Sequence, residues 1–223
     1  MDQNSVPVRR FILHLDNYEK HQEVLEMGPY IRKMDLALSV YELLVDHGGD
    51  MISMKVTWEM LETMDISPEH LFELAMACSK ELLPVEIKRL DQMLIGLGGL
   101  VPETPDEEEM TNEVMDFCLS TMVEEEMPIY ALTNKRFVRG ATILFYTNIA
   151  KEMAELFDRD LILLPSSVHE WLLMPDDEGL DLADMAGMVR EINATVVEEK
   201  DFLSDHIYRY VREKDDFEIV KNV

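Results

Sequence analysis

Two serines, a histidine and a glutamate lie within one short stretch of the sequence, Ser166, Ser167, His169 and Glu170. Acyl transfer needs a hydroxyl nucleophile, an imidazole base and an orienting carboxylate, provided that the three groups converge in space. Adjacent residues of a strand point to opposite faces, so His169 and Glu170 would not address one substrate if this stretch is extended. The sequence contains no Gly-x-Ser-x-Gly elbow that would lift a serine out of the fold.

A structural interpretation accounts for the same residues. The segment 165–167, Pro-Ser-Ser, is typical of a hydrogen-bonded turn, and His169 would then bond a backbone carbonyl. We favour this interpretation. In the alternative, the protein is a small hydrolase or a metal-dependent enzyme whose candidate catalytic residues are Ser167, His169, Glu170 and His206.

A second polar cluster, Ser204-Asp205-His206, lies further along the chain. His206 could join His169 and Glu170 in a metal site of two histidines and a carboxylate, but no His-Glu-x-x-His spacing supports this. Asp205 fits better as a turn former before a strand. We therefore expect no metal and no cofactor.

The elements that would position these residues are short apolar runs and helical patterns. Gly140 separates two apolar runs and indicates a hairpin, and Pro165 ends a buried strand. The expected elements are strands at 129–132 and 141–145, a helix over 148–157, strands at 161–164 and 170–174, a helix over 182–196 and a strand at 207–211.

In the first half, residues 9–26 have helical apolar spacing, which Gly28-Pro29 ends. Apolar runs at 36–41 and 51–55 flank a glycine pair and predict another hairpin, although the first run also fits a helix. Thr57 should cap a helix through Met64. Ser67-Pro68 should start a second helix that runs to Leu83, after which Pro84 opens another.

These elements predict an α+β fold with two β-hairpin/helix lobes joined by an acidic helical connector. We assign residues 1–95 to an N-terminal helical and hairpin lobe, 96–128 to an acidic linker and helix, and 129–223 to a C-terminal α/β lobe, all within one compact unit. Segments 36–63 and 129–157 both contain an apolar run, a glycine turn, a second run and a helix. This echo suggests an internal duplication, although the two copies share almost no identities.

The net charge of the chain limits the kinds of molecule that the protein can bind. The chain has 20 Lys and Arg against 46 Asp and Glu, a formal net charge of −26. Such a chain repels nucleic acid and anionic lipid and favours a protein partner with a basic surface. Between Leu90 and Asn134 there are eleven acidic residues and no Lys or Arg. A solvated helix face is one explanation of this segment. The other is a partner-binding surface formed by Glu107, Glu108, Glu109, Glu113 and Asp116.

The sequence also bears on location. Residues 1–7 lack the apolar core of a signal peptide, and the longest run of apolar residues and glycines, 93–101, is far short of the roughly 20 residues that span a bilayer. Cys78 and Cys118 are expected to be free thiols. We expect a cytoplasmic protein that does not contact membrane.

Several strings resemble those of an uncharacterised domain-of-unknown-function family of bacteria and their integrative mobile elements. The resemblance covers about residues 8–212, and Leu-Pro-Ser-Ser-x-His-Glu at 164–170 is its most specific part. The chain departs from the family at Cys78-Ser79, where an Asn-Thr pair is more common. Other matching strings are at 17–20, 35–37, 82–84, 130–134, 140–141, 193–195 and 203–208. Trp58 with 66–75 is more distantly similar to another uncharacterised bacterial family of mixed α/β fold.

The resemblance implies a bacterial or mobile-element origin and supplies no known reaction. Our leading hypothesis is a non-enzymatic, acidic protein that binds another macromolecule. In its most specific form, the protein is an accessory factor of a mobile element or phage that acts on host defence or replication proteins. The sequence does not define the oligomeric state.

Overall fold

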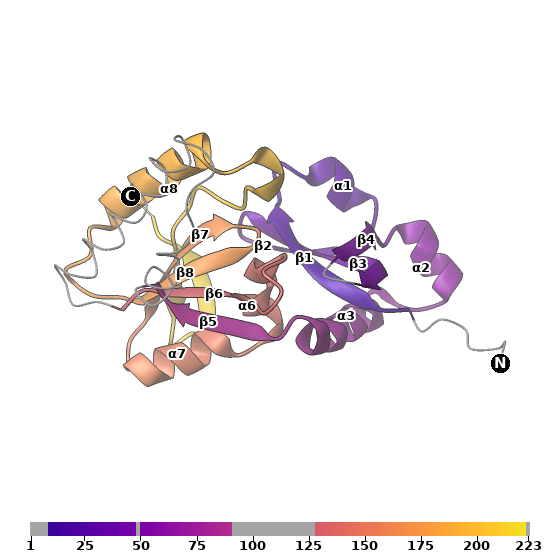
Figure 1. The fold of residues 1–223 in the computed structure, drawn as a ribbon, viewed down its shortest axis with the longest axis horizontal. Coiled ribbons are helices and arrows are strands. Elements are labelled where there is room, and N and C mark those ends of the chain that lie inside the picture. Colours follow the sequence, from indigo (N-terminus) through magenta and orange to yellow (C-terminus); the bar gives the residue numbers. More distant parts are fainter. Residues whose placement is uncertain (1–8, 48–49, 91–127, 222–223) are drawn as a thin grey trace. The chain divides into compact units, whose positions relative to one another are not determined.

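The computed structural model describes residues 9–47, 50–90 and 128–221 (Figure 1). The chain forms two compact units, an N-terminal unit (Met1–Pro84) and a C-terminal unit (Val85–Val223). Each unit contains an antiparallel sheet and helices, so the predicted α+β class is confirmed. The predicted connector lies largely outside the described residues.

The N-terminal unit is built on the long strand β3. Strand β1 pairs with one edge of β3, while β2 and β4 pair with successive parts of the other edge. A β-bulge between Leu43 and Val45 shifts the register of β3 against β4. The described elements of this unit are β1 (Phe11–Asn17), α1 (Gln22–Glu26), β2 (Tyr30–Lys33), β3 (Leu36–His47), β4 (Asp50–Lys55), α2 (Trp58–Met64) and α3 (Pro68–Leu82).

The predicted helix over 9–26 is wrong, because residues 11–17 form strand β1 and only the end of the segment is the short helix α1. Every residue of β1 is buried. A strand that is covered on both faces loses the alternation of apolar and polar residues, and its apolar run then resembles a helix.

The predicted hairpin and both helix caps in this unit are confirmed. Strands β3 and β4 pair directly. Thr57 Oγ1 accepts from the Met60 amide at 3.3 Å, and Ser67 Oγ accepts from the His70 amide at 3.2 Å. The helix predicted to open at Pro84 is wrong, because Val85 begins strand β5.

Helix α3 packs beside β1, whose outer edge has no strand partner among the described residues. The Leu13 amide points to this edge and donates to Ser79 Oγ of α3 at 3.0 Å. Both residues are fully buried. A buried amide without an acceptor is costly, so the Ser79 hydroxyl allows α3 to close the edge of the sheet.

The sheet of the C-terminal unit has the strand order β10-β9-β7-β8-β6-β5, and every neighbouring pair is antiparallel. The described elements are β5 (Val85–Arg89), β6 (Tyr130–Asn134), η1 (Gly140–Thr142), α6 (Ile143–Tyr146), α7 (Ile149–Phe157), β7 (Leu161–Ser167), β8 (Glu170–Pro175), α8 (Leu182–Thr195), η2 (Glu199–Asp201), β9 (Tyr208–Val211) and β10 (Asp216–Ile219). Strand β5 falls within the predicted N-terminal lobe, yet it pairs with β6 in this sheet.

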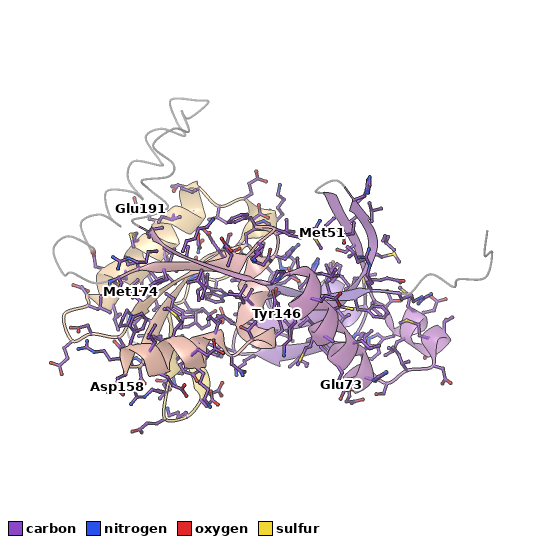
Figure 2. All side chains as sticks on the ribbon, turned by 60° about the horizontal axis from the view of Figure 1, so that its bottom comes forward. Met51, Glu73, Tyr146, Asp158, Met174 and Glu191 are labelled. Carbon is purple, nitrogen blue, oxygen red and sulfur yellow. The ribbon has the colours of Figure 1, made fainter. Side chains whose placement is uncertain are left out.

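Helix α8 covers one face of this sheet. Ile162 and Leu164 of β7 and Met174 of β8 form a buried cluster with Met185 and Val189 of α8. Figure 1 shows α7 on the opposite side of the strands from α8. Met174, which belongs to the buried cluster, is labelled in Figure 2. The strands at the centre of the sheet are therefore covered on both faces, as their nearly continuous apolar sequences require.

Most elements predicted for this half are confirmed, namely the strands at 129–132, 161–164, 170–174 and 207–211 and the helices over 148–157 and 182–196. Strand β7 continues through Pro165 to Ser167, so that proline does not end it. The predicted strand at 141–145 is wrong, because η1 and α6 occupy it. Segments 36–63 and 129–157 therefore fold differently, and the predicted duplication is wrong.

Over the residues that the structure describes, we find no helix that combines the length and the apolar character needed to cross a membrane.

The bond between Leu13 and Ser79 yields a prediction. Ser79→Ala should lower the free energy of unfolding by about 1–3 kcal/mol, because it leaves the buried Leu13 amide without its acceptor. Hydrogen exchange at Leu13 should accelerate as well. Urea unfolding followed by circular dichroism measures the first effect and NMR the second. Lys80→Ala, at the exposed neighbouring position, is the control. Equal effects of the two substitutions would show that this hydrogen bond is dispensable.

Candidate functional site

The serines of the predicted catalytic stretch lie at the end of β7 and form hydrogen bonds across the turn that joins β7 to β8. Ser166 Oγ donates to Glu170 Oε1 at 3.0 Å, and Ser167 Oγ accepts from the His169 amide at 3.1 Å. Ser167 and Glu170 face each other across the ladder, which leaves Val168 and His169 at the tip. Residues 165–167 thus belong to β7 and the turn consists of Val168 and His169, so the predicted turn at 165–167 is wrong, although the serines do form hydrogen bonds within the protein.

Both ring nitrogens of His169 have protein partners. Nδ1 accepts from the Arg139 amide at 3.1 Å, and Nε2 lies 3.2 Å from Asp201 Oδ1. Since an amide can only donate, Nδ1 has to be the bare nitrogen and Nε2 carries the proton that Asp201 accepts. The backbone group bonded by His169 is thus an amide and not the carbonyl that we expected. A general base needs a free nitrogen directed at a nucleophile, and this bonding leaves His169 none.

The backbone of the turn holds two other segments in place. The Val168 amide donates to the Asp201 carbonyl at 2.8 Å, and the Val168 carbonyl accepts from the Ala141 amide at 3.2 Å. Thr133 Oγ1 donates to the His169 carbonyl at 2.8 Å. A Cβ atom on Gly140 would lie 2.2 Å from that carbonyl oxygen, so only glycine fits between the turn and β6. This close approach, and not a hairpin, explains why position 140 is a glycine.

The remaining candidate residue, His206, lies in a different turn, before β9. Its amide donates to Ser204 Oγ at 3.0 Å, and its Nδ1 lies 3.4 Å from the same oxygen. Across the described part of the chain, no three His, Cys, Asp or Glu side chains are grouped so that they could hold a metal ion. The partner-binding candidates Glu107, Glu108, Glu109, Glu113 and Asp116 lie outside the described residues.

A set of buried and half-buried polar side chains, which the sequence did not single out, lies on one face of the N-terminal sheet. Register and alternation place these residues on the same face, because paired residues share a face and so do residues two apart. The set comprises His14, Asp16, Ser39, Tyr41, Ser53 and Lys55. The rings of His14 and Tyr41 stack at 3.7 Å between centroids, and Ser53 Oγ lies 3.4 Å from His14 Nε2.

Lys55 is the unusual member of this set. It is only 7% exposed, its Nζ makes no hydrogen bond among the described residues, and the Tyr41 ring centroid lies 5.7 Å away. Burial lowers the pKa of Lys55 to about 8, and the carboxylate of Asp16 opposes that shift only in part. A lysine of this kind can act as a base or nucleophile. Since its Nζ is closed to solvent, we assign it a structural role.

Exposed apolar side chains lie on the other face of the same sheet, along the edge formed by β2 and β4. Ile31, Val45, Ile52 and Met54 form this apolar row and are 51%, 39%, 54% and 45% exposed. Ile31 pairs with Leu38 of β3, while Ile52 and Met54 pair with Val45 and Glu42. These three positions of β3 lie on one face of the sheet, so the apolar row lies on that face as well. Among the described residues, β2 and β4 pair only with β3, so each leaves an open edge. An exposed apolar strand edge marks a site for protein contact.

The turn yields a prediction about stability. His169→Ala should lower the free energy of unfolding by about 1–3 kcal/mol, because the Arg139 amide and the Asp201 carboxylate lose a partner. Asp201→Asn keeps an acceptor for Nε2 and should cost less than about 1 kcal/mol. Urea unfolding of the three proteins measures both. If His169→Ala leaves stability unchanged, and the unaltered protein hydrolyses members of an ester or phosphoester panel, the hydrolase hypothesis becomes the better one.

Lys55 yields a prediction about pH. The pKa of Lys55 is about 8 in the folded protein and 10.5 ordinarily, so between these values the unfolded chain binds more protons and stability rises with pH. Relative to Lys55→Met, the unaltered protein should gain about 3 kcal/mol of unfolding free energy between about pH 7 and pH 10.5. Urea unfolding at several pH values measures the difference. Lys80→Met, at an exposed lysine of α3, should show no such trend, and parallel profiles for all three proteins would contradict the assignment.

Comparison with the curated proteins finds no match, and comparison with the solved structures finds none either. The sequence does match the model of a family of unknown function, DUF5688, over residues 6–212. The match spans nearly the whole chain and confirms the resemblance to an uncharacterised family. The chain therefore belongs to DUF5688, a family whose function is unknown.

Proposed function

We propose that this protein is not an enzyme and that it binds another protein, one that carries a basic surface. The observation that carries the proposal is the apolar row on the open β2 and β4 edge of the N-terminal sheet. These side chains are half exposed although the unit has a buried core available to it. Apolar side chains on an unpaired strand favour a partner that adds its own strand and covers them.

Charge elsewhere in the N-terminal unit favours a basic partner, although β2 itself carries the exposed base Arg32 beside Ile31. The segment 56–79, which follows β4 directly, contains no Lys or Arg. Exposed acidic side chains lie on its helices α2 and α3 and at the C-cap of α2, namely Glu59, Glu62, Asp65, Glu69 and Glu73. Acidic charge on the same unit as an apolar contact mainly speeds the encounter with a basic partner, while the apolar contact slows dissociation. Nucleic acid is disfavoured for the same reason, since phosphates would be repelled.

The proposal extends to the setting of the protein. A cytoplasmic location is supported by Cys78, which is a free and partly buried thiol. The origin in a bacterium or its mobile elements, and the role against host defence or replication proteins, are supported only by the family resemblance. The acidic residues Glu107, Glu108, Glu109, Glu113 and Asp116 are a second surface for the same basic partner.

The test combines capture with matched variants. Captured partners are compared for the unaltered protein and for Ile52→Ser/Met54→Ser. We expect the double substitution to weaken the complex about tenfold or more, because two apolar side chains no longer become buried in it. Leu156→Ser is the control, because Leu156 is 72% exposed on α7 of the other unit. A partner retained equally by all three proteins would exclude this edge as the contact.

The salt dependence of the association rate measures the contribution of charge to binding. The screening length falls from about 8 Å at 0.15 M salt to about 3 Å at 1 M, so association should slow steeply with salt. Glu59→Gln/Glu62→Gln, and separately Glu107→Gln/Glu108→Gln/Glu109→Gln, should each slow association and leave the fold intact. Kinetics measured by surface-based binding would show which acidic surface acts. Association that is indifferent to salt and to both sets would contradict the basic partner.

A further inference from the structure

A hollow on the C-terminal unit is lined by basic side chains over an apolar floor. Its volume is about 380 Å³. Helix α8 forms one wall, the turn before β9 a second, and the end of β10 a third. The lining residues are Ala186, Arg190, Asp205, His206, Ile207, Ile219, Val220 and Lys221. Figure 2 labels Glu191, which follows Arg190 on α8 and helps to locate this wall.

The floor of the hollow is firmly built. Ile207 and Ala186 belong to the buried cluster under α8, and Val220 packs against it. The Val220 amide donates to the Ile207 carbonyl at 2.9 Å, which joins the chain after β10 to the turn before β9. Asn193 Nδ2 donates at 2.8 Å to the Ser204 carbonyl and fixes that turn against α8. The hollow is therefore framed by core contacts.

The two strongest bases of the hollow, Arg190 and Lys221, form no ion pair among the described residues, although Lys221 is near enough to Glu218 to help lower the pKa of that carboxyl. Many other bases of this unit are paired with acids, as in Arg159–Asp177, Arg209–Asp176, Arg212–Asp158, Lys151–Asp215 and Lys214–Glu218. Within the described residues, Arg190 and Lys221 form no ion pair and both line the hollow. In a chain with 46 acidic residues against 20 basic ones, two unpaired bases in one place are unexpected.

We propose that this hollow binds a small organic oxyanion, a carboxylate or phosphate with a short apolar body. The guanidinium of Arg190 provides a planar pair of donors that suits either head group, and the ammonium of Lys221 adds a second positive charge. The apolar body would lie on Ile207, Ile219 and Val220. The inference is independent of the proposed protein contact, which lies on the other unit.

Asp205 also lines the hollow, and its carboxylate opposes an anion. Its Oδ1 accepts a hydrogen bond from Asn193 Nδ2 at 2.8 Å, which holds the group and offsets part of its charge. The sign of its effect distinguishes two classes of ligand. Asp205→Asn keeps the acceptor for Asn193 and removes the charge, so it should tighten binding of an anion and weaken binding of a cation.

The test uses acetate, hexanoate and inorganic phosphate as probes of the full chain, at about 0.15 M salt to screen the net charge. Binding is followed by NMR titration of the backbone amides that line the hollow. Hexanoate should bind more tightly than acetate because its tail buries apolar surface. A preference for phosphate over both carboxylates would instead identify a phosphate ligand. Saturation by none of the three would overturn the proposal.

Variants locate the site. Arg190→Gln and Lys221→Gln should each weaken binding by about ten- to a hundredfold, because each removes a charge-assisted hydrogen bond. Lys135→Gln is the matched control, since Lys135 is exposed, forms no ion pair among the described residues and lies outside the hollow. It should leave the affinity within about twofold of its starting value. Equal losses in all three variants would show that only the net charge matters and would overturn the site.

Discussion

The C-terminal unit depends on the hydrogen bonds of the β7–β8 turn, because they hold two segments that are distant in sequence. Val168 bonds the backbone of Ala141 on one side and of Asp201 on the other. The His169 ring bonds the same two segments, through the Arg139 amide and the Asp201 carboxylate. Gly140 allows its segment to approach the backbone of the turn closely. The residues that looked like a catalytic group thus stabilise a junction. Their polar atoms satisfy one another and backbone groups, which is what a buried or half-buried junction requires.

Charge is distributed unevenly over the molecule, and this unevenness guides both functional proposals. The chain as a whole carries a net charge of −26, so a partner is expected to be basic. Most bases of the C-terminal unit are neutralised in local ion pairs at its surface, where each pair contributes little to stability. Arg190 and Lys221 differ because they are left unpaired around a hollow with an apolar floor. A local positive site can bind a small anion despite the opposite net charge, because salt screens distant charges more than near ones.

Local signals in the sequence predicted local structure well. The caps at Thr57 and Ser67 were found because a cap needs only one side chain and the next few amides. Strand β1 was missed because burial on both faces removes its alternation. The segment 141–145 was missed because its fold depends on Gly140 packing against a turn nearly 30 residues away. The hollow at Arg190 was also missed, since only the fold brings α8 next to β10.

Strand β4 exposes apolar side chains and buries a charged one, which is the reverse of the usual arrangement. Its apolar residues Ile52 and Met54 are exposed, whereas Lys55 is buried at a cost that its lowered pKa reflects. A shift of one residue in register would exchange the two faces, burying the apolar side chains and exposing the charge. The pairing of Tyr41 with Lys55, before the bulge in β3, keeps the present register. The proposed contact accounts for this arrangement, since a partner that covered Ile52 and Met54 would supply the burial that the β4 edge lacks.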